Sequence, residues 1–239
     1  MKLNEKTYYR GWEYIKKGDY HKNLDPNWAY TPTYLKKMKY VRNFLNKLPK
    51  ETKILDAGCG EGVLVEEYRL KGYLIEGLDL NYESEYVRRG DILDLPYSEN
   101  TFDVVVCLDV LEHIDFKNQS LALENFWRVL KPSGRLVISI PNLAHFNSRV
   151  YFFLKGILDR TDVEANHIGE RPIKENIKLL QNAGFEIISK KGITLTVPLL
   201  YRRIICRKPA QYRWLHDFLD LFAVPSLAML NIFVCKIIK

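Results

Sequence analysis

Three glycines at alternate positions follow an acidic residue early in this sequence. They lie in Ile54-Leu55-Asp56-Ala57-Gly58-Cys59-Gly60-Glu61-Gly62, where an apolar run ends in a loop. Such glycines let the backbone turn tightly and approach a ligand, and the helix expected next presents its N-terminus to that ligand. The Asp56 carboxylate would repel a pyrophosphate, but together with free loop amides it suits a ligand that carries an ammonium and a carboxylate group. The loop therefore predicts a site for an amino acid.

Two later carboxylates extend this ligand. Asp79 ends the apolar segment Gly77-Leu78-Asp79-Leu80, where it could accept hydrogen bonds from both hydroxyls of a ribose. Asp91 follows a third expected strand and could accept from the exocyclic amine of adenine. An amino acid, a ribose and an adenine together describe S-adenosylmethionine. A nicotinamide dinucleotide fits less well. Its fingerprint, G-x-G-x-x-G/A, would place a small residue at position 63 if it began at Gly58, but that position is Val63.

The elements that position these residues alternate between strands and helices. Short apolar runs ended by Gly or Asp predict buried parallel strands, and helical spacing or Pro and Gly boundaries predict the helices between them. This alternation indicates an α/β fold with a doubly wound, mostly parallel sheet, whose ligands bind at the carboxyl ends of the strands. The strands are expected within 53–58, 73–80, 102–110, 134–142, 185–190 and 231–237, and the helices within 33–48, 62–70, 120–130 and 172–183.

Five blocks in order make residues 50–190 resemble the class I methyltransferases. They are the glycine loop (56–62), Asp79, the segment GDILDLP (90–96), FDVVVCLDVLEH (102–113) and VLKPSGRLVISIPN (129–142). The resemblance implies a seven-stranded Rossmann-like sheet with helices on both faces and S-adenosylmethionine as cofactor. Segments 156–161 and 180–185, with His167 and Arg171, resemble the branch that acts on small metabolites, quinone precursors and surface sugars. By the same resemblance, the cofactor-binding residues are Asp56, Gly58, Gly60, Gly62, Asp79, Leu80, Asp91, Ile92 and Leu108.

One spacing departs from this pattern. Only eleven residues separate Asp79 from Asp91, whereas a parallel crossover with its helix takes about a dozen or more. We therefore expect a short turn around 81–85 in place of a helix. One face of the sheet would then be thin, or covered by the segment that precedes the first strand.

Candidates for catalysis are three histidines near strand ends or in the insertion after the fifth strand: His113, His145 and His167. Each could act as a general base on an acceptor hydroxyl, which typically contributes about 10² to 10⁴ in rate, although for each a role outside catalysis is the commoner outcome. Tyr30, His145 and Arg171 are candidates for substrate binding. Methyl transfer depends mainly on proximity and alignment, so a base is optional.

The chain divides into three expected parts: a basic, aromatic arm and helix (1–50), a core (51–191) with an insertion at 142–171, and a C-terminal cap with the last strand (192–239). The arm is either a lid or a cover for the sheet. In the cap, an apolar helical stripe follows a group of arginines. The stripe, which comprises Trp214, Leu215, Phe218, Leu219 and Phe222, either packs into the core, the commoner outcome, or lies at a membrane interface.

Composition and charge limit the class of protein. Hydrophobic residues make up 47% and charged residues 27%, which excludes wholesale disorder. The net charge of +7 is uneven, because residues 1–50 carry 12 Lys/Arg against 4 Asp/Glu, and residues 51–198 carry 17 against 23. This leaves an RNA methyltransferase open, although no RNA-binding motif is recognised and nucleic acid is not the expected partner.

Four cysteines without a CxxC pair, and no histidine at metal-ligand spacing, predict no metal. The absence of a signal-like stretch predicts a cytoplasmic protein, with peripheral membrane contact as an option. The expected activity is methyl transfer to a hydroxyl or other nucleophile of a small acceptor, glycosidic or lipid-linked. The alternative from another class is a non-catalytic module that binds the cofactor without turnover.

Overall fold

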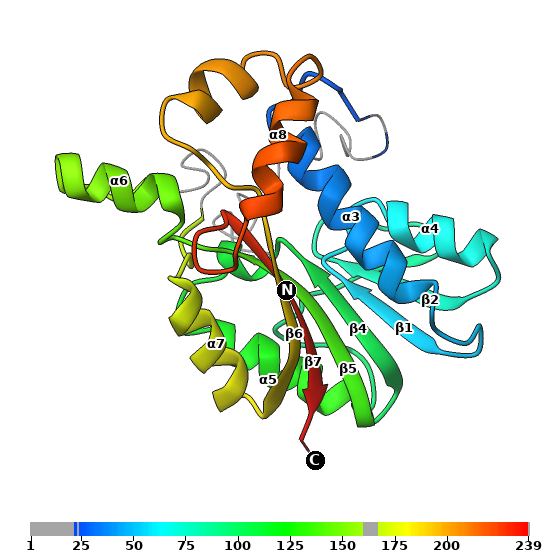
Figure 1. The fold of residues 1–239 in the computed structure, drawn as a ribbon. Coiled ribbons are helices and arrows are strands. Elements are labelled where there is room, and N and C mark those ends of the chain that lie inside the picture. Colours follow the sequence, from blue (N-terminus) through cyan, green and yellow to red (C-terminus); the bar gives the residue numbers. More distant parts are fainter. Residues whose placement is uncertain (1–21, 23, 160–166, 239) are drawn as a thin grey trace.

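The computed structural model describes residues 22, 24–159 and 167–238 of the chain. Its centre is a seven-stranded sheet with strand order β3-β2-β1-β4-β5-β7-β6 (Figure 1). All pairings are parallel except those of β7, which runs antiparallel to both β5 and β6. This confirms the predicted mostly parallel, doubly wound α/β fold. The strands are β1 (Lys53–Ala57), β2 (Leu74–Asp79), β3 (Val87–Arg89), β4 (Phe102–Leu108), β5 (Leu130–Pro141), β6 (Phe185–Ile193) and β7 (Leu230–Ile237).

Helices cover both faces of the sheet, because successive residues of each buried strand point to opposite sides. In β1, Ile54 packs in a core cluster with α3 and α4, while Leu55 packs in a second cluster with α5 and α7. The helices are α3 (Thr31–Leu45), α4 (Val63–Leu70), α5 (Gln119–Val129), α6 (Phe146–Lys155), α7 (Ile173–Asn182) and α8 (Arg213–Leu219). Short turns of helix are η1 (Leu111–His113), η2 (Tyr201–Ile205) and η3 (Asp220–Phe222).

The connection between β2 and β3 contains no helix, as its length predicts. Residues 80–86 form bends and irregular backbone. Helix α4 reaches over the start of β3, where the Arg69 guanidinium lies 4.2 Å from the ring centre of Tyr86. Helix α3 packs on the same face as α4. The described part of the N-terminal segment therefore helps to cover this face, while residues 1–21 of the predicted arm lie outside the described residues.

Packing into the core was the commoner outcome expected for the aromatic stripe near the C-terminus. The structure shows instead that the stripe does not pack into the core. Trp214, Phe218 and Phe222 are 66%, 54% and 57% exposed. The side of α8 that is buried is polar: His216 and, just after the helix, Asp220. Helical spacing predicts that apolar side chains share a face, but it does not determine which face meets the protein.

Candidate functional site

The glycine loop joins β1 to α4 at the carboxyl edge of the sheet. Gly58, Gly60 and Gly62 have φ angles of 77°, 58° and 83°, a region that L-residues with side chains rarely adopt. The loop is also packed tightly. A Cβ on Gly58 would lie 2.4 Å from Cγ2 of Val110, and one on Gly62 would lie 2.6 Å from Cγ2 of Val87. The sequence pattern therefore reflects both backbone conformation and close packing.

Asp79 holds this loop to the end of the neighbouring strand. Its Oδ2 accepts from the amide of Gly60 at 2.8 Å, and its Oδ1 accepts from the amides of Asn81 (2.8 Å) and Tyr82 (3.3 Å). These three hydrogen bonds fix the orientation of the Asp79 carboxylate at the carboxyl end of β2. The predicted ribose acid thus lies directly against the predicted amino-acid loop.

Asp56 lies beneath the loop at the end of β1 and is only 5% exposed. Burial, followed by the negative charge of Asp79, raises its pKa to about 7, and the Lys37 ammonium partly offsets this rise. A cationic ligand beside these two carboxylates would favour the ionised form of Asp56. The edge is therefore suited to a positively charged group.

The other predicted cofactor residues lie along the same edge. Asp91 follows β3, and its Oδ1 accepts from the amide of Leu93 at 2.9 Å. Ile92 is 6% exposed in the core cluster around β2 and β4. The carbonyl of Leu80 accepts from the Arg89 guanidinium at 3.3 Å. Leu108 is the last residue of β4. The predicted cofactor residues thus end or follow the four neighbouring strands β1 to β4, whose carboxyl ends lie at one edge of the sheet.

A polar cluster around Asp109 was not selected from the sequence. Asp109 follows β4 with φ 55°. Its carboxylate accepts from the Tyr30 hydroxyl at 2.5 Å and from the Lys37 ammonium and the Ser139 hydroxyl. Burial opposes ionisation, but the Lys37 ammonium and the hydrogen bonds hold the pKa of Asp109 below its usual value. Asp109 lies in the LDVLEH block, and this position is the sequence signal that could have identified it. Its partners in the structure are distant in sequence.

The substrate candidates have different surroundings. Tyr30 lies in this Asp109 cluster, at the carboxyl end of β4. Arg171 donates through Nε to Oε1 of Gln119 at 2.7 Å, and its guanidinium lies 4.4 Å from the ring centre of Phe116. Its side chain thus ties the end of the insertion to the start of α5. A substrate role for either residue stays a prediction.

The three candidate histidines separate into a pair and a single residue. His145 is 2% exposed, and its ring nitrogens lie 2.8 Å from Oγ1 of Thr196 and 3.1 Å from the carbonyl of Asp159. Burial lowers its pKa. The rings of His113 and His167 instead lie edge to face, with centres 4.7 Å apart. Both partners of this pair are partly exposed, so it is better placed than His145 to meet a substrate.

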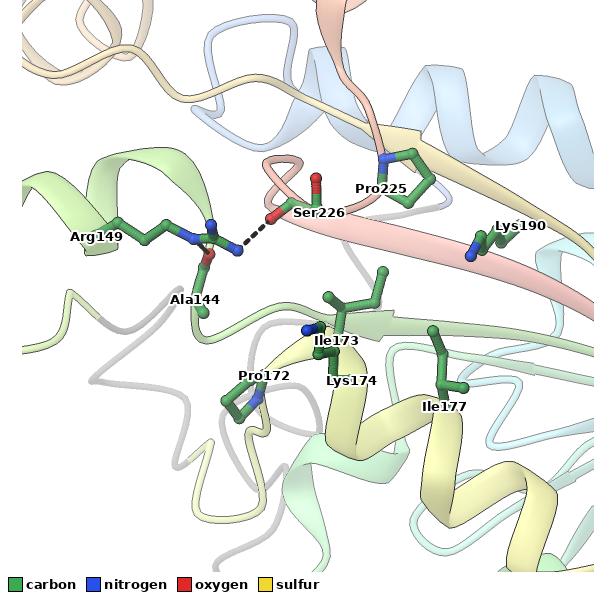
Figure 2. A pocket seen from close by; sticks show the side chains of 9 residues that line it. All are labelled: Ala144, Arg149, Pro172, Ile173, Lys174, Ile177, Lys190, Pro225 and Ser226. Atoms are coloured by element: carbon green, nitrogen blue, oxygen red, sulfur yellow. Dashed lines mark hydrogen bonds between the residues drawn. The ribbon is translucent and has the colours of Figure 1, made fainter.

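A cavity of about 400 Å³ opens between α6, α7 and the loop before β7 (Figure 2). None of the predicted cofactor residues is among the described residues that line it. The Arg149 guanidinium bridges one side by donating to the carbonyls of Ala144 (2.6 Å) and Ser226 (2.9 Å). This cavity is therefore separate from the glycine-loop site. Its lining residues are Ala144, Arg149, Pro172, Ile173, Lys174, Ile177, Lys190, Pro225 and Ser226.

Comparison with known proteins identifies the family. Residues 28–190 match the family model described as a methyltransferase domain. A probable S-adenosylmethionine-dependent methyltransferase of Mycolicibacterium smegmatis is 29% identical over 150 residues, or 59% of this chain and 54% of that protein. The ubiquinone biosynthesis O-methyltransferase of Vibrio atlanticus is 28% identical over 159 residues, or 59% of this chain and 66% of that protein. The chain thus spans about half to two thirds of these relatives.

The fold is also shared with solved structures. An S-adenosylmethionine-dependent methyltransferase from Thermotoga maritima superposes with a TM-score of 0.60 at 16% identity, covering 97% of this chain and 100% of that one. At this identity the likeness concerns the fold alone. Sheet, glycine loop and family match together define the class: the chain belongs to the methyltransferase-domain family of class I S-adenosylmethionine-dependent proteins. The cofactor of this family is S-adenosylmethionine.

The residues at the edge fit that cofactor. The negative charges of two neighbouring carboxylates, Asp56 and Asp79, would complement the ammonium and sulfonium charges of this cofactor. The three glycines of the loop adopt left-handed φ angles, which turn the backbone tightly at this edge. Asp79 and Asp91 offer acceptors to a ribose and an adenine amine.

The raised pKa of Asp56 predicts that the affinity for S-adenosylmethionine rises with pH. Below pH 7 the buried carboxyl is mostly neutral and attracts the cationic cofactor less. If only ionised Asp56 and the protonated cofactor amine bind, affinity increases about sixfold between pH 6.0 and 7.5, because the eightfold rise from Asp56 is partly offset by loss of protons from the α-amino group, whose pKa is about 7.8. Calorimetric titration at several pH values measures this. Asp56→Asn should flatten the profile over that interval, and an equally steep profile in the variant would contradict the assignment.

Proposed function

We propose that the protein transfers the methyl group of S-adenosylmethionine to a hydroxyl or other nucleophile of a small, lipid-linked acceptor at a membrane surface. The observation that carries the reaction is the juxtaposition of the glycine loop, Asp79 and Asp56 at one edge of the sheet. The observation that favours a lipid-linked acceptor is the exposed apolar surface on α6 and α8.

In this proposal the bound cofactor supplies an electrophilic methyl carbon on sulfur, and the nucleophile displaces a neutral thioether. The chain's own residues orient the reactants. The loop and Asp79 fix the donor, while Tyr30 and Lys37 keep the carboxylate of Asp109 ionised beside it. An acceptor hydroxyl must lose its proton, and the partly exposed pair of His113 and His167 is better placed than His145 to meet that hydroxyl. Alignment of this kind supplies most of the acceleration in such displacements.

The apolar surface comprises side chains of α6, the segment after it, the residue Leu199 before η2, α8 and η3. Helix α6 extends away from the body of the protein (Figure 1). Phe153 and Leu154 are 87% and 68% exposed. The turn η2 lies near α6 and the segment after it, since the Arg202 guanidinium is 5.9 Å from the ring centre of Tyr151 and 2.9 Å from the Asp159 carboxylate. The exposed apolar members are Phe152, Phe153, Leu154, Ile157, Leu158, Leu199, Trp214, Phe218, Leu221 and Phe222.

Exposed cations accompany these apolar side chains. Arg202, Arg203, Arg207, Lys208 and Arg213 lie between or within η2 and α8. Apolar side chains flanked by Lys and Arg are typical of surfaces that lie on anionic membranes. Contiguous exposed apolar patches generally mark interaction sites. Among the helices of the described residues, none has the length and apolar character needed to cross a bilayer.

Vesicle binding should depend on α6. In co-sedimentation with vesicles of phosphatidylcholine and phosphatidylglycerol, the double substitution of Phe153 and Leu154 by serine should lower the partition coefficient tenfold or more, because burying each side chain contributes about 1.5 kcal/mol or more. The matched control is Leu70→Ser, because Leu70 is 90% exposed on α4. Equal losses in both variants, or no binding by the unaltered protein, would contradict the membrane proposal.

The acceptor class is tested with S-adenosylmethionine that carries a labelled methyl group. The protein is incubated with three separate pools: a lipid extract, a water-soluble metabolite extract and total RNA. We expect label in the lipid pool. Label mainly in RNA, with binding that falls steeply with salt, would replace the proposal with RNA methylation, and cofactor binding without label in any pool would favour a non-catalytic module.

A further inference from the structure

Three side chains able to ligate a metal converge just after β4. Glu112 and His113 belong to η1, and His167 lies at the far end of the insertion. One ligand atom from each residue lies within 4.8 Å of the others. Metal donors at a bond length of about 2.1 Å lie roughly 3 to 4 Å apart, so small side-chain rotations would complete the geometry.

The fold holds the two segments together with specific contacts. The amide of Gly169 donates to the Glu112 carbonyl at 2.9 Å. The Gln119 side-chain amide donates to the carbonyls of Leu111 (2.9 Å) and Gly169 (2.8 Å). A Cβ on Gly169 would lie 2.0 Å from the carbonyl oxygen of Ile114. The position of His167 beside η1 is therefore built into the backbone.

Glu112 is a buried carboxyl group without a hydrogen-bond partner among the described residues. It is 1% exposed, and within the described part of the chain neither carboxyl oxygen has a hydrogen-bond partner. Burial of a carboxyl group without a hydrogen-bond partner destabilises the fold. The nearby carboxylates of Asp109 and Glu170 add negative charge, and Lys37 is already paired with Asp109. A cation bound by Glu112 would remove this deficit.

Glu170 supports His167 in the way seen around metal sites. Its carboxylate, whose side chain is fully buried, lies 2.9 Å from Nδ1 of His167. A carboxylate that accepts from one ring nitrogen fixes the tautomer and orientation of the ring and leaves the other nitrogen for a metal.

We propose that Glu112, His113 and His167 bind one divalent ion of the zinc, cobalt and manganese group. Two imidazoles and one carboxylate are donors that such ions accept, whereas Ca²⁺ and Mg²⁺ prefer oxygen donors alone. Three protein ligands leave coordination positions open, as in catalytic rather than structural metal sites. The role of the ion rests on the proposed function. The open coordination positions would bind the acceptor oxygen, lower the pKa of the acceptor hydroxyl and orient it toward the methyl donor.

The sequence spacing gives no sign of this site, which is why no metal is expected from it. Glu112 and His113 are adjacent, and His167 reaches them only through the return of the insertion to η1. The proposal therefore replaces the prediction made from spacing alone.

The site is tested by metal binding to untagged protein that has been stripped with a chelator. We expect one equivalent of Co²⁺ to bind with a visible absorption band, and Zn²⁺ to displace it. Glu112→Gln and His167→Ala should each weaken Zn²⁺ binding a hundredfold or more in calorimetry, and Glu170→Gln about tenfold. Glu124→Gln, on the exposed side of α5, is the matched control. Glu112→Gln replaces the buried carboxyl group with an amide of nearly the same shape, so it should keep the fold.

Binding of S-adenosylhomocysteine by the same variants separates this inference from the proposed function. Unchanged affinity for S-adenosylhomocysteine together with lost metal binding supports the site. Metal binding that Glu112→Gln leaves unchanged, or no stoichiometric binding of Co²⁺, Zn²⁺ or Mn²⁺, overturns it whatever the outcome for methyl transfer.

Discussion

Replacing Gly58 by alanine should cost the protein roughly 2 to 5 kcal/mol of unfolding free energy and abolish measurable cofactor binding. Two effects add. An L-residue in the left-handed region costs about 1 to 2 kcal/mol, and overpacking costs about 1 to 3 kcal/mol, since the new Cβ would lie 2.4 Å from Val110 Cγ2. Relief of the clash would displace either the loop or the segment after β4. Denaturant unfolding and calorimetric titration with S-adenosylhomocysteine measure both losses.

Gly72 supplies the matched control. Its φ is +81°, yet a Cβ there would meet no heavy atom within 4 Å, so Gly72→Ala should show the conformational cost alone and leave cofactor affinity unchanged. Val110→Ala should destabilise the unaltered protein but partly rescue Gly58→Ala. Equal costs at Gly58 and Gly72, or no coupling between positions 58 and 110, would mean that the close packing of the loop is not what requires glycine.

Asp79→Asn should weaken S-adenosylhomocysteine binding tenfold to a hundredfold, because hydrogen bonds to a charged acceptor contribute about 1.5 to 3 kcal/mol. The substitution retains one oxygen for the amides of Asn81 and Tyr82. It removes the charge and the acceptor for either the Gly60 amide or a ribose hydroxyl. Asp94→Asn, an exposed carboxylate after β3, should leave the affinity unchanged.

A ligand analogue distinguishes ribose binding from a role in shaping the loop. The unaltered protein should bind 2′-deoxy S-adenosylhomocysteine more weakly than the parent ligand, and in Asp79→Asn that difference should largely vanish. If the substitution weakens both ligands by the same factor, Asp79 acts only by holding the Gly60 amide, and the ribose assignment fails.

The strands, their order along the chain and the glycine loop could be predicted because each depends on local pattern. Buried parallel strands are continuous apolar runs, and left-handed positions select glycine. The short turn between β2 and β3 followed from counting residues. These features required no knowledge of which distant side chains meet.

The polar contacts of the site could not be predicted in the same way. Asp109 is paired with Lys37 and Tyr30 across 72 and 79 residues, and nothing in their sequence surroundings links them. His145 resembles a candidate base by position, but its contacts with Thr196 and Asp159 depend on how the insertion packs. The outward orientation of the α8 stripe reflects a polar anchor, where Asp220 accepts from the Lys36 ammonium at 2.7 Å.

The place of β7 in the sheet has a consequence for how the chain is made. This strand is the last along the chain, yet it lies between β5 and β6 and pairs with both. The half of the sheet that carries the cofactor residues, β1 to β4, can assemble during synthesis from sequence that has already left the ribosome. The other half cannot close until β7 has been made, because β5 and β6 are joined only through their pairing with β7. The nascent protein thus completes its cofactor-binding half well before the sheet can close.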